Sequence, residues 1–306
     1  MRPGPTRAGP AGGTGPAPRA PARGFRRRLW FGLLTVSGLA RRGFFIPSRQ
    51  AAAAQAAGAR PPYPAAEARL ADCEAGFHEA LGWLEAYGAD LLRIGSEPAP
   101  APRWAQGWFP RLDGAMAYVL VRRLAPRRIV EVGSGHSTRF LARAVRDGGL
   151  DTAITAIDPA PRAAIADLPV TLLRHTVQDT VARGTGSEVF GALSAGDFLM
   201  IDSSHVLMPG SDVDLLLGRV VPALPSGAIL HLHDIFLPDD YPVAWDWRGY
   251  NEQLGVLPLL LGGAWEVLFA SHYVATRMAA ALAGSVAARL PLAPEAIESS
   301  LWLKKR

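Results

Sequence analysis

The strongest constraint on the fold is an alternation of short apolar runs with helical segments in the C-terminal half of the chain. Five runs have the length of strands: 128–132, 153–157, 170–173, 197–201 and 227–232. Helices are expected between them, beginning near His136, Pro159, Thr185 and Met208. Because continuous apolar strands separated by helices are typical of a parallel sheet covered on both faces, the pattern predicts a doubly wound α/β fold. A later pair, 264–270 and 299–304, predicts an antiparallel edge strand.

Two helical segments precede this region. From Tyr63 to about Ile94 the apolar side chains recur every three or four residues, which predicts one face of an amphipathic helix. A second helix is expected at about 111–124. These segments predict an N-terminal helical cover over 63–125 and a main domain over 126–306. The face of the first helix would consist of Leu70, Cys73, Phe77, Leu81 and Leu84.

The first 62 residues differ from the rest in composition. Residues 1–24 are a Pro/Gly/Ala/Arg mixture with almost no large apolar side chain, which predicts a disordered tail. Residues 25–62 are expected to be an amphipathic or interfacial segment followed by a linker. Its apolar stretch, 29–40, is too short to span a bilayer, which takes about 20 residues. Three alternatives stay open: a secretory or twin-arginine signal, an interfacial helix that contacts a membrane through 25–47, and a helix that packs on the domain or on a second subunit.

The charge distribution argues against nucleic acid as a partner. The formal net charge is +5, but residues 1–50 hold ten arginines and no acidic residue, which leaves 22 basic against 27 acidic side chains elsewhere. No stripe of basic and aromatic residues follows in the folded part, so no nucleic-acid binding is predicted. The single cysteine excludes an internal disulfide framework and a multi-cysteine zinc site. The protein is expected to be cytoplasmic, or peripheral to a membrane.

The turn after the first strand, "EVGSGHST", is where a ligand is first expected, since ligands of such sheets bind at the carboxyl ends of the strands. A phosphate loop is excluded because the turn has no lysine. A dinucleotide fingerprint would have a small residue where Thr138 stands, and Glu131 would repel a pyrophosphate. The turn therefore favours a ligand with a positively charged part.

The same segment resembles motif I of class I S-adenosylmethionine-dependent methyltransferases. The resemblance implies a Rossmann-like fold and S-adenosyl-L-methionine as cofactor. It implies that the acidic residue at the strand end holds the methionine part, that an acidic residue after the second strand binds the ribose, and that two residues after the third strand contact adenine. Carried over to this sequence, the cofactor-binding residues are Glu131, Gly133, Ser134, Gly135, Ser137, Thr138, Asp158, Gln178 and Asp179. Ser137 and Thr138 are expected to donate to the cofactor carboxylate or to cap the helix.

Two further segments, "LMIDSSH" and "ILHLHDIF", resemble bacterial methyltransferases with paired "ID..H" and "HD" motifs, a group similar to macrocin-type sugar O-methyltransferases. The resemblance covers about 105–275. Three roles stay open for the polar groups of these segments. Asp202 and Asp234 belong to a divalent-metal site for Mg or Mn, or His205, His233 and Asp234 form a metal-free catalytic set with a histidine as general base, or the groups are structural. His231 is expected to be a core histidine.

The segment after the fifth strand is rich in aromatic and acidic residues and is expected to border a small-molecule acceptor. The resemblance implies an O-methyltransferase acting on a small or sugar-like molecule. The alternatives are a non-catalytic cofactor-binding or membrane-associated accessory protein and an NAD-dependent oxidoreductase. Trp108, Asp113 and Tyr118 are expected on a helix that closes over the cofactor. Expected acceptor-lining residues are Tyr241, Trp245, Trp247, Arg248, Tyr250 and Asn251, with Glu252 and Gln253 beginning a helix.

Overall fold

The structure is a computed structural model that describes residues 25–55, 58 and 60–306. The chain divides into two compact units, one ending at Ala54 and the other running from Gln55 to Arg306. The tail expected over 1–24 lies outside the described residues. In the N-terminal unit the structure describes helix α1 (Phe25–Val36) and a single 3₁₀ turn at Ala51–Ala53. Within the described part of the chain, no helix is long and apolar enough to cross a membrane.

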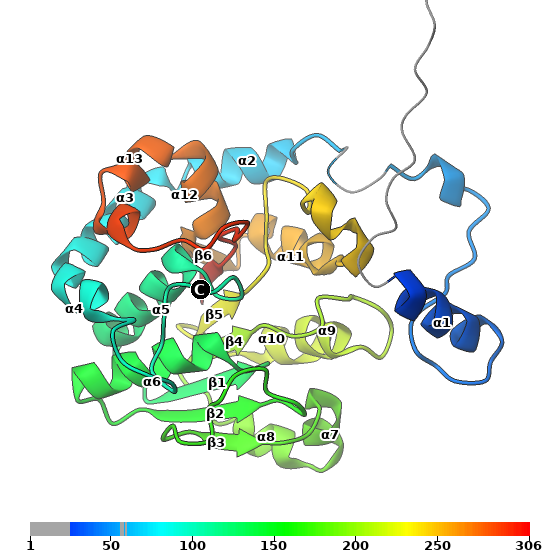
Figure 1. Ribbon diagram of the computed structural model, residues 1–306, viewed down its shortest axis with the longest axis horizontal. Coiled ribbons are helices and arrows are strands. Elements are labelled where there is room, and N and C mark those ends of the chain that lie inside the picture. The colour runs from blue at the N-terminus through cyan, green and yellow to red at the C-terminus, as the bar shows by residue number, and fades with distance from the viewer. Residues whose placement is uncertain (1–24, 56–57, 59) are drawn as a thin grey trace, which may run out of the picture. The chain divides into compact units, whose positions relative to one another are not determined.

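A seven-stranded sheet organises the larger unit, in the order β3-β2-β1-β4-β5-β7-β6 (Figure 1). The first five strands pair with one another in parallel. Strand β7 is antiparallel to both β5 and β6, so the predicted antiparallel pair is present at one edge. All seven predicted strands are confirmed to within two residues: β1 (Arg128–Val132), β2 (Ala153–Ile157), β3 (Thr171–Leu173), β4 (Phe198–Ile201), β5 (Ile229–Leu232), β6 (Trp265–Ala270) and β7 (Leu301–Lys305).

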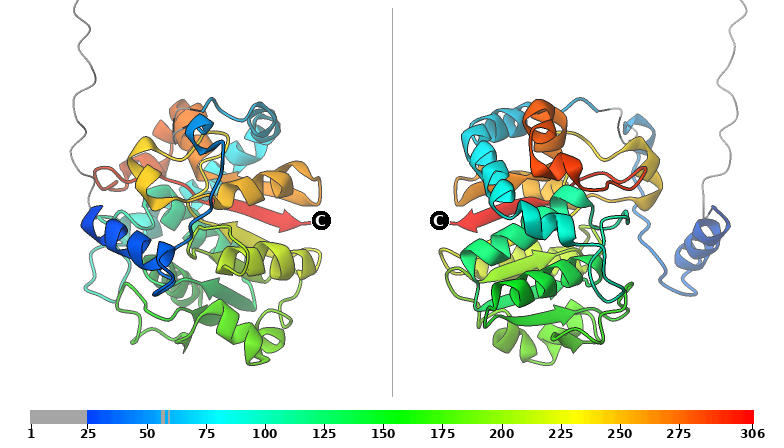
Figure 2. Two further views of the ribbon diagram at one scale, coloured as in Figure 1. Left: turned by 90° about the vertical axis from the view of Figure 1, so that its right-hand side faces the viewer. Right: turned by 60° about the vertical axis from the view of Figure 1, so that its left-hand side comes forward.

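The strand order reverses between β1 and β4, because β2 and β3 extend the sheet on one side of β1 and the later strands on the other. Right-handed crossovers in opposite directions place the connecting helices on opposite faces of the sheet. Figure 2 shows α5 (Arg111–Leu124) and α6 (His136–Gly148) in front of the sheet in one view. The other view brings forward the helices of the opposite face: α9 (Asp212–Leu215), its π-helical continuation Leu216–Val220, α10 (Val221–Ala223) and α11 (Glu252–Leu261). The switch point between β1 and β4 is where a doubly wound sheet binds its ligand.

The remaining helices differ in part from expectation. The amphipathic segment over 63–94 is not one helix but three, α2 (Pro64–Ala71), α3 (Glu74–Ala86) and α4 (Gly88–Arg93). Its apolar stripe still faces the core, with Leu70, Phe77 and Leu84 fully buried. The chain bends at Asp72–Cys73 and at Tyr87, so the same stripe follows a curved surface.

Between β2 and β3 the expected helix near Pro159 is absent, and residues 158–170 form a loop. Prolines at 159, 161 and 169 explain the difference, because proline lacks the backbone donor of a helix interior and restricts the residue before it. Helix α7 (Val177–Ala182) was not expected, and α8 (Thr185–Val189) begins where predicted. The helix expected near Met208 begins at Asp212, where the Ser211 hydroxyl accepts from the Asp214 amide as its N-cap. The chain closes with α12 (Ser271–Arg277), α13 (Ala279–Ala283) and two 3₁₀ segments, Val243–Arg248 and Val286–Arg289.

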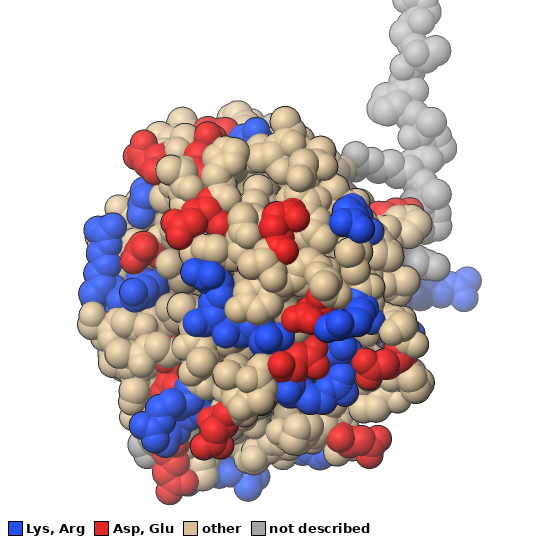
Figure 3. Space-filling view, turned by 90° about the vertical axis from the view of Figure 1, so that its left-hand side faces the viewer, with Lys and Arg blue, Asp and Glu red and all other residues tan. Residues whose placement is uncertain are grey.

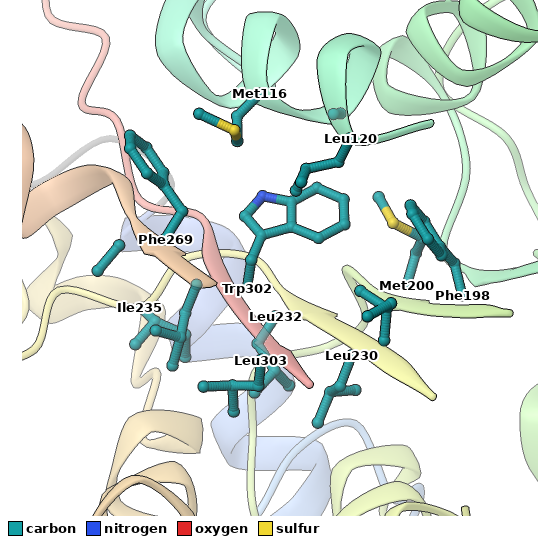
Figure 4. Close-up of a cluster of buried hydrophobic side chains, with 14 of the residues drawn as sticks. Met116, Leu120, Phe198, Met200, Leu230, Leu232, Ile235, Phe269, Trp302 and Leu303 are labelled. Carbon is teal, nitrogen blue, oxygen red and sulfur yellow. The ribbon is translucent and has the colours of Figure 1, made fainter. Parts of the chain in front are cut away.

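The core fills both faces of the sheet, and one part of it lies between the sheet and helix α5. Figure 4 shows Trp302 of β7 beneath Met116 and Leu120 of α5, beside the apolar side chains of β4 and β5. Trp302 is fully buried and packs edge-on against Phe198 with the ring centroids 5.8 Å apart. On the face drawn in Figure 3, basic and acidic side chains are interspersed.

Candidate functional site

The glycine turn after β1 lies directly against the end of β4. Gly133 has φ +82°, and a Cβ built there would lie 1.8 Å from the backbone oxygen of Asp202. Only glycine combines this backbone conformation with so close an approach. The turn therefore holds the ends of β1 and β4 together at the switch point of the sheet.

Glu131, at the end of β1, is buried below this turn. The hydroxyl of Ser137 donates to its carboxylate at 2.5 Å and that of Thr138 at 2.6 Å. Burial raises the pKa of Glu131 to about 8, and the charges of Asp202 and Asp158 add to the effect. A buried carboxyl among other carboxylates is a site that a cation would stabilise.

The two hydroxyls expected to hold a cofactor carboxylate are thus engaged with Glu131. Thr138 Oγ1 also accepts from the Gly135 amide at 2.9 Å, which is the capping role expected of it. Gly135 is open by contrast, since a Cβ there would meet only Ala163, at 3.8 Å and beyond.

Asp158, at the end of β2, is hydrogen-bonded to the glycine turn. One carboxylate oxygen accepts from the backbone and the hydroxyl of Ser134 at 2.8 and 2.9 Å, and the other accepts from the Ala160 amide at 2.7 Å. The side chain is half-buried, and no helix follows it before β3. Glu131, Gly133, Ser134, Gly135 and Asp158 therefore form one connected group.

The two residues expected near adenine lie apart from this group. Asp179 is the third residue of α7, is exposed, and accepts from the hydroxyl of Thr176 at 2.8 Å as part of a capping box. Gln178 Nε2 donates to the carbonyl of Gly210 at 3.5 Å. No contact described for these two side chains reaches the glycine turn, so their adenine role stays a prediction.

A second group gathers at the ends of β4 and β5, where two imidazoles lie between carboxylates. His205 Nε2 is 3.1 Å from Asp202 Oδ1 and 3.5 Å from Asp234 Oδ2. His233 Nδ1 is 3.6 Å from Asp202 Oδ1 and 3.5 Å from Asp234 Oδ1. The structure thus brings together all four groups that the sequence placed after these strands.

Each imidazole has a further carboxylate on its other nitrogen. Glu252 Oε2 lies 2.8 Å from His205 Nδ1, and Asp113 Oδ2 lies 3.4 Å from His233 Nε2. Asp113 also accepts from the Ser299 and Ser300 amides, and Ser299 Oγ donates to Asp234 at 3.2 Å. From the sequence, Glu252 was expected only to begin a helix and Asp113 only to lie on a covering helix. No local signal marks Ser299.

The carboxylates outweigh the effect of burial on both histidines. Burial would lower the pKa of His205, but hydrogen bonds with Asp202 and Glu252 raise it well above its usual value. Burial would likewise lower the pKa of His233, but the charges of Asp234 and Asp202 raise it well above its usual value. In the free protein both rings therefore carry a proton at neutral pH and balance the carboxylates around them.

The backbone is strained at two of these positions. His205 has φ +59° and Asp234 has φ +56°, values that non-glycine residues rarely adopt. Such strain persists only where surrounding contacts hold it, and it concentrates at functional sites. The carbonyl of His205 accepts from the amides of Asn251 and Glu252, which fixes one of the two turns.

The aromatic segment after β5 borders this group. Arg248 lies with its guanidinium carbon 3.7 Å from the ring centroid of Trp245, and its Nη1 is 4.0 Å from Asp234 Oδ2. Tyr250 packs on His205 with the ring centroids 4.6 Å apart. Asn251 is bonded through its side-chain amide to the backbone of Leu207, so it ties the segment to the loop after β4. Tyr241 is buried and accepts from the Gln253 amide, whereas Trp247 is 45 % exposed.

The helix expected to close over the cofactor is mostly core. Tyr118 is fully buried and its hydroxyl donates to Asp147 at 2.9 Å. Trp108 precedes the helix, is 58 % exposed, and stacks parallel on His136 with the centroids 5.7 Å apart. Of the three residues, Trp108 is thus the one that contacts the start of α6, directly after the glycine turn. His231 is a buried core histidine as expected, bonded through Nε2 to Ser300 Oγ at 2.8 Å.

The donors at the strand ends determine whether a divalent metal fits this site. Across residues 25–55, 58 and 60–306, no group of three or more His, Cys, Asp or Glu side chains is arranged to hold a metal ion. Asp202 and Asp234 face protonated imidazoles, which already neutralise them. A metal role for these carboxylates stays a prediction, and no chemical step below depends on one.

A search against protein families matches residues 130–235 to a family described as a methyltransferase domain. The match spans 106 of the 306 residues of the chain. It runs from the middle of β1 to just beyond β5 and includes the glycine turn, Asp158, Asp202, His205, His233 and Asp234. The matched segment therefore contains the glycine-turn group and the four side chains at the ends of β4 and β5, whereas Asp113 and Glu252 lie outside it. No curated protein matches the sequence significantly.

Solved structures similar to the chain include an SAH-bound methyltransferase of Podospora anserina, PaMTH1, with 16% identity, TM-score 0.39, and coverage of 86% of this chain and 99% of that one. Another is an O-methyltransferase of Bacillus cereus in complex with SAH, with 11% identity, TM-score 0.38, and coverage of 74% and 91%. A third is cofactor-bound Rv0187 from MTB, with 14% identity, TM-score 0.38, and coverage of 81% and 99%. The fold of residues 128–306 follows from its own strand order.

Proposed function

We propose that the protein transfers a methyl group from S-adenosyl-L-methionine to an oxygen of a small or sugar-like acceptor. The observation that supports this choice of cofactor is the buried Glu131 beneath the glycine turn, with Asp158 and Asp202 close by. These carboxylates favour a ligand with a sulfonium and an ammonium group, and they disfavour the pyrophosphate of a dinucleotide. The match of residues 130–235 to a methyltransferase domain supports the same choice.

In this proposal, each residue of the glycine-turn group contacts a different part of the cofactor. Glu131 would face the positive part of the cofactor, and the open side of Gly135 would let the backbone approach it. Asp158 would accept from the ribose hydroxyls with the lone pairs that Ser134 and Ala160 leave free. When bound, the cofactor supplies an already activated methyl group, so the protein has to align the acceptor and remove its proton.

Oxygen as the acceptor atom is supported by the acid–imidazole group at the strand ends. Asp202 and Asp234, each shared between His205 and His233, can hold an acceptor hydroxyl by hydrogen bonds. An imidazole of the group that has released its own proton to solvent can then take up the proton of the hydroxyl. The aromatic segment 241–250 and the partly exposed Arg248 and Trp247 border this group and suit a flat or sugar-bearing molecule. The proton acceptor in this proposal is therefore His205 or His233 in its neutral form.

Calorimetric titration with S-adenosylhomocysteine and with NAD tests the cofactor. We expect binding of S-adenosylhomocysteine and none of NAD; binding of NAD alone would replace the proposal by an oxidoreductase. Binding of S-adenosylhomocysteine without methyl transfer to any hydroxylated acceptor in a panel would favour a non-catalytic accessory protein.

Turnover measured with EDTA and with added Mg²⁺ or Mn²⁺ tests the metal. We expect unchanged turnover, because imidazolium groups already neutralise Asp202 and Asp234. Loss of turnover in EDTA, restored by one of the two metals, would assign these carboxylates to a metal site instead.

A further inference from the structure

The N-terminal unit concentrates apolar side chains on its surface. Among the described residues, half of the large hydrophobic side chains that are exposed fall within 25–46, and the other half are scattered over 60–306. No side chain of the described residues 25–54 is buried. Such a concentration marks an interaction surface rather than ordinary surface variation. The exposed side chains are Phe25, Leu29, Trp30, Leu33, Val36, Leu39, Phe44, Phe45 and Ile46.

Helix α1 carries four of these side chains on one face. Phe25, Leu29, Leu33 and Val36 follow one another at intervals of four, four and three residues, and each is more than half exposed. Helical geometry places positions at these intervals on a single stripe. Trp30, 59 % exposed, lies at its margin. Within the described residues of its own unit, 25–54, nothing buries this apolar face of the helix.

The charges around this face indicate what covers it. Residues 25–54 contain six arginines, at 26–28, 41, 42 and 49, and no acidic residue. Arg26 and Arg28 flank the stripe on its two sides in a helical projection. Arg27 lies over the ring of Phe31 at 5.1 Å and Arg41 over that of Phe44 at 5.3 Å, so their charged heads extend from apolar bodies. Apolar side chains flanked by arginines suit an anionic lipid surface, where the rings enter the headgroup region and the arginines meet phosphates.

A second copy of the chain fits this surface less well. Pairing two such helices would bring two sets of arginines together without an acidic residue to offset them. At 12 residues, α1 is about 18 Å long and can lie in the plane of a membrane surface without spanning it. We propose that residues 25–46 dock the protein on membranes that carry anionic phospholipid, with the apolar stripe of α1 inserted at the headgroup level.

Flotation of the full-length protein with vesicles tests the proposal. We expect binding to vesicles of phosphatidylcholine mixed with phosphatidylglycerol, little binding to phosphatidylcholine alone, and release at high salt. The double substitution Leu29→Glu with Leu33→Glu should lower the partition coefficient by at least about tenfold. Replacing Arg26, Arg27 and Arg28 by Gln should lower it on the order of 100-fold, since each basic residue near an anionic surface contributes roughly fivefold.

Leu92→Glu is the matched control, because Leu92 is 42 % exposed on α4 of the other unit and should leave vesicle binding unchanged. Binding of S-adenosylhomocysteine should be equal in all variants, which separates a docking defect from a folding defect. Equal flotation of wild type and the double variant would overturn the proposal. So would light scattering that shows a dimer of the wild type, dissociated by the double substitution, without vesicle binding, since the occupant would then be a second copy.

Discussion

Burial of Glu131 lowers the stability of the ligand-free protein, and the same residue belongs to the proposed cofactor site. Its pKa is raised from 4.5 to about 8, so between these values the folded protein keeps a proton that the unfolded chain releases. The free energy of unfolding therefore falls as the pH rises from about 4.5 to about 8. A cation bound beside the carboxylate would reverse this penalty.

Glu131→Gln should accordingly make the ligand-free protein more stable at pH 8 than the wild type and remove much of the pH dependence of the melting temperature. The same substitution should weaken binding of S-adenosylmethionine by about 1–3 kcal/mol, as expected for loss of a buried charge partner. Melting curves across this pH range and calorimetric titration check both effects. Stabilisation without loss of cofactor affinity would remove Glu131 from the binding site.

Glu252 holds His205 from the side opposite Asp202 and Asp234. Glu252→Gln keeps the shape but removes the charge, so His205 should lose its fixed orientation and part of its proton affinity. We expect kcat to fall roughly tenfold to 100-fold with an unchanged Kd for S-adenosylhomocysteine, and the pH profile of kcat to shift. Glu266→Gln, on the exposed side of β6, is the control. A fall in stability alone, with kcat and its pH profile intact, would reduce Glu252 to a structural residue.

At the scale of elements, the approach of α5 to α6 depends on one glycine. A Cβ at Gly114 would lie 2.9–3.1 Å from three ring carbons of Phe140. The two helices pack on each other, and α6 begins at the glycine turn, so a displaced α6 would move the site as well. The contact is therefore both a packing and a positioning feature.

Gly114→Ala should destabilise the protein by about 1–3 kcal/mol through overpacking. Gly82→Ala is the matched control, because Gly82 lies inside α3 with nothing within 4 Å of a built Cβ. It should stabilise by roughly 0.5–1 kcal/mol, the helix propensity difference between the two residues. Chemical unfolding of both variants measures the two values; the same sign for both would contradict the close packing of α5 on α6.

At the scale of the whole molecule, the two units should be separable. The compact unit from Gln55 to Arg306 contains the entire sheet and both groups of the site. Removal of residues 1–54 should therefore leave the melting temperature within a few degrees and the affinity for S-adenosylhomocysteine unchanged, while vesicle binding is lost. A large fall in melting temperature would show that the first unit packs on the second.

Local sequence patterns predict the strands, the glycine turn and the apolar, arginine-rich character of residues 25–46. These features are local, so they can be predicted without knowing the tertiary contacts. They are an apolar run of strand length, a glycine where only glycine tolerates φ +82°, and a composition without acidic residues. The doubly wound order followed from the same pattern, because right-handed crossovers leave few alternatives. Asp202, His205, His233 and Asp234 were predictable for the same reason, as residues at strand ends that meet at one edge.

The hydrogen-bond partners of these residues follow only from the tertiary structure. Glu252 is 47 residues from His205, and Ser299 is 65 residues from Asp234; no local pattern encodes such pairs. The tertiary structure also shows that the hydroxyls of Ser137 and Thr138 donate hydrogen bonds to Glu131. It shows as well that the apolar stripe of 63–94 is divided among three helices. The physical reason is that periodicity specifies which face of an element is buried, whereas hydrogen-bond partners depend on which elements the folded chain brings into contact.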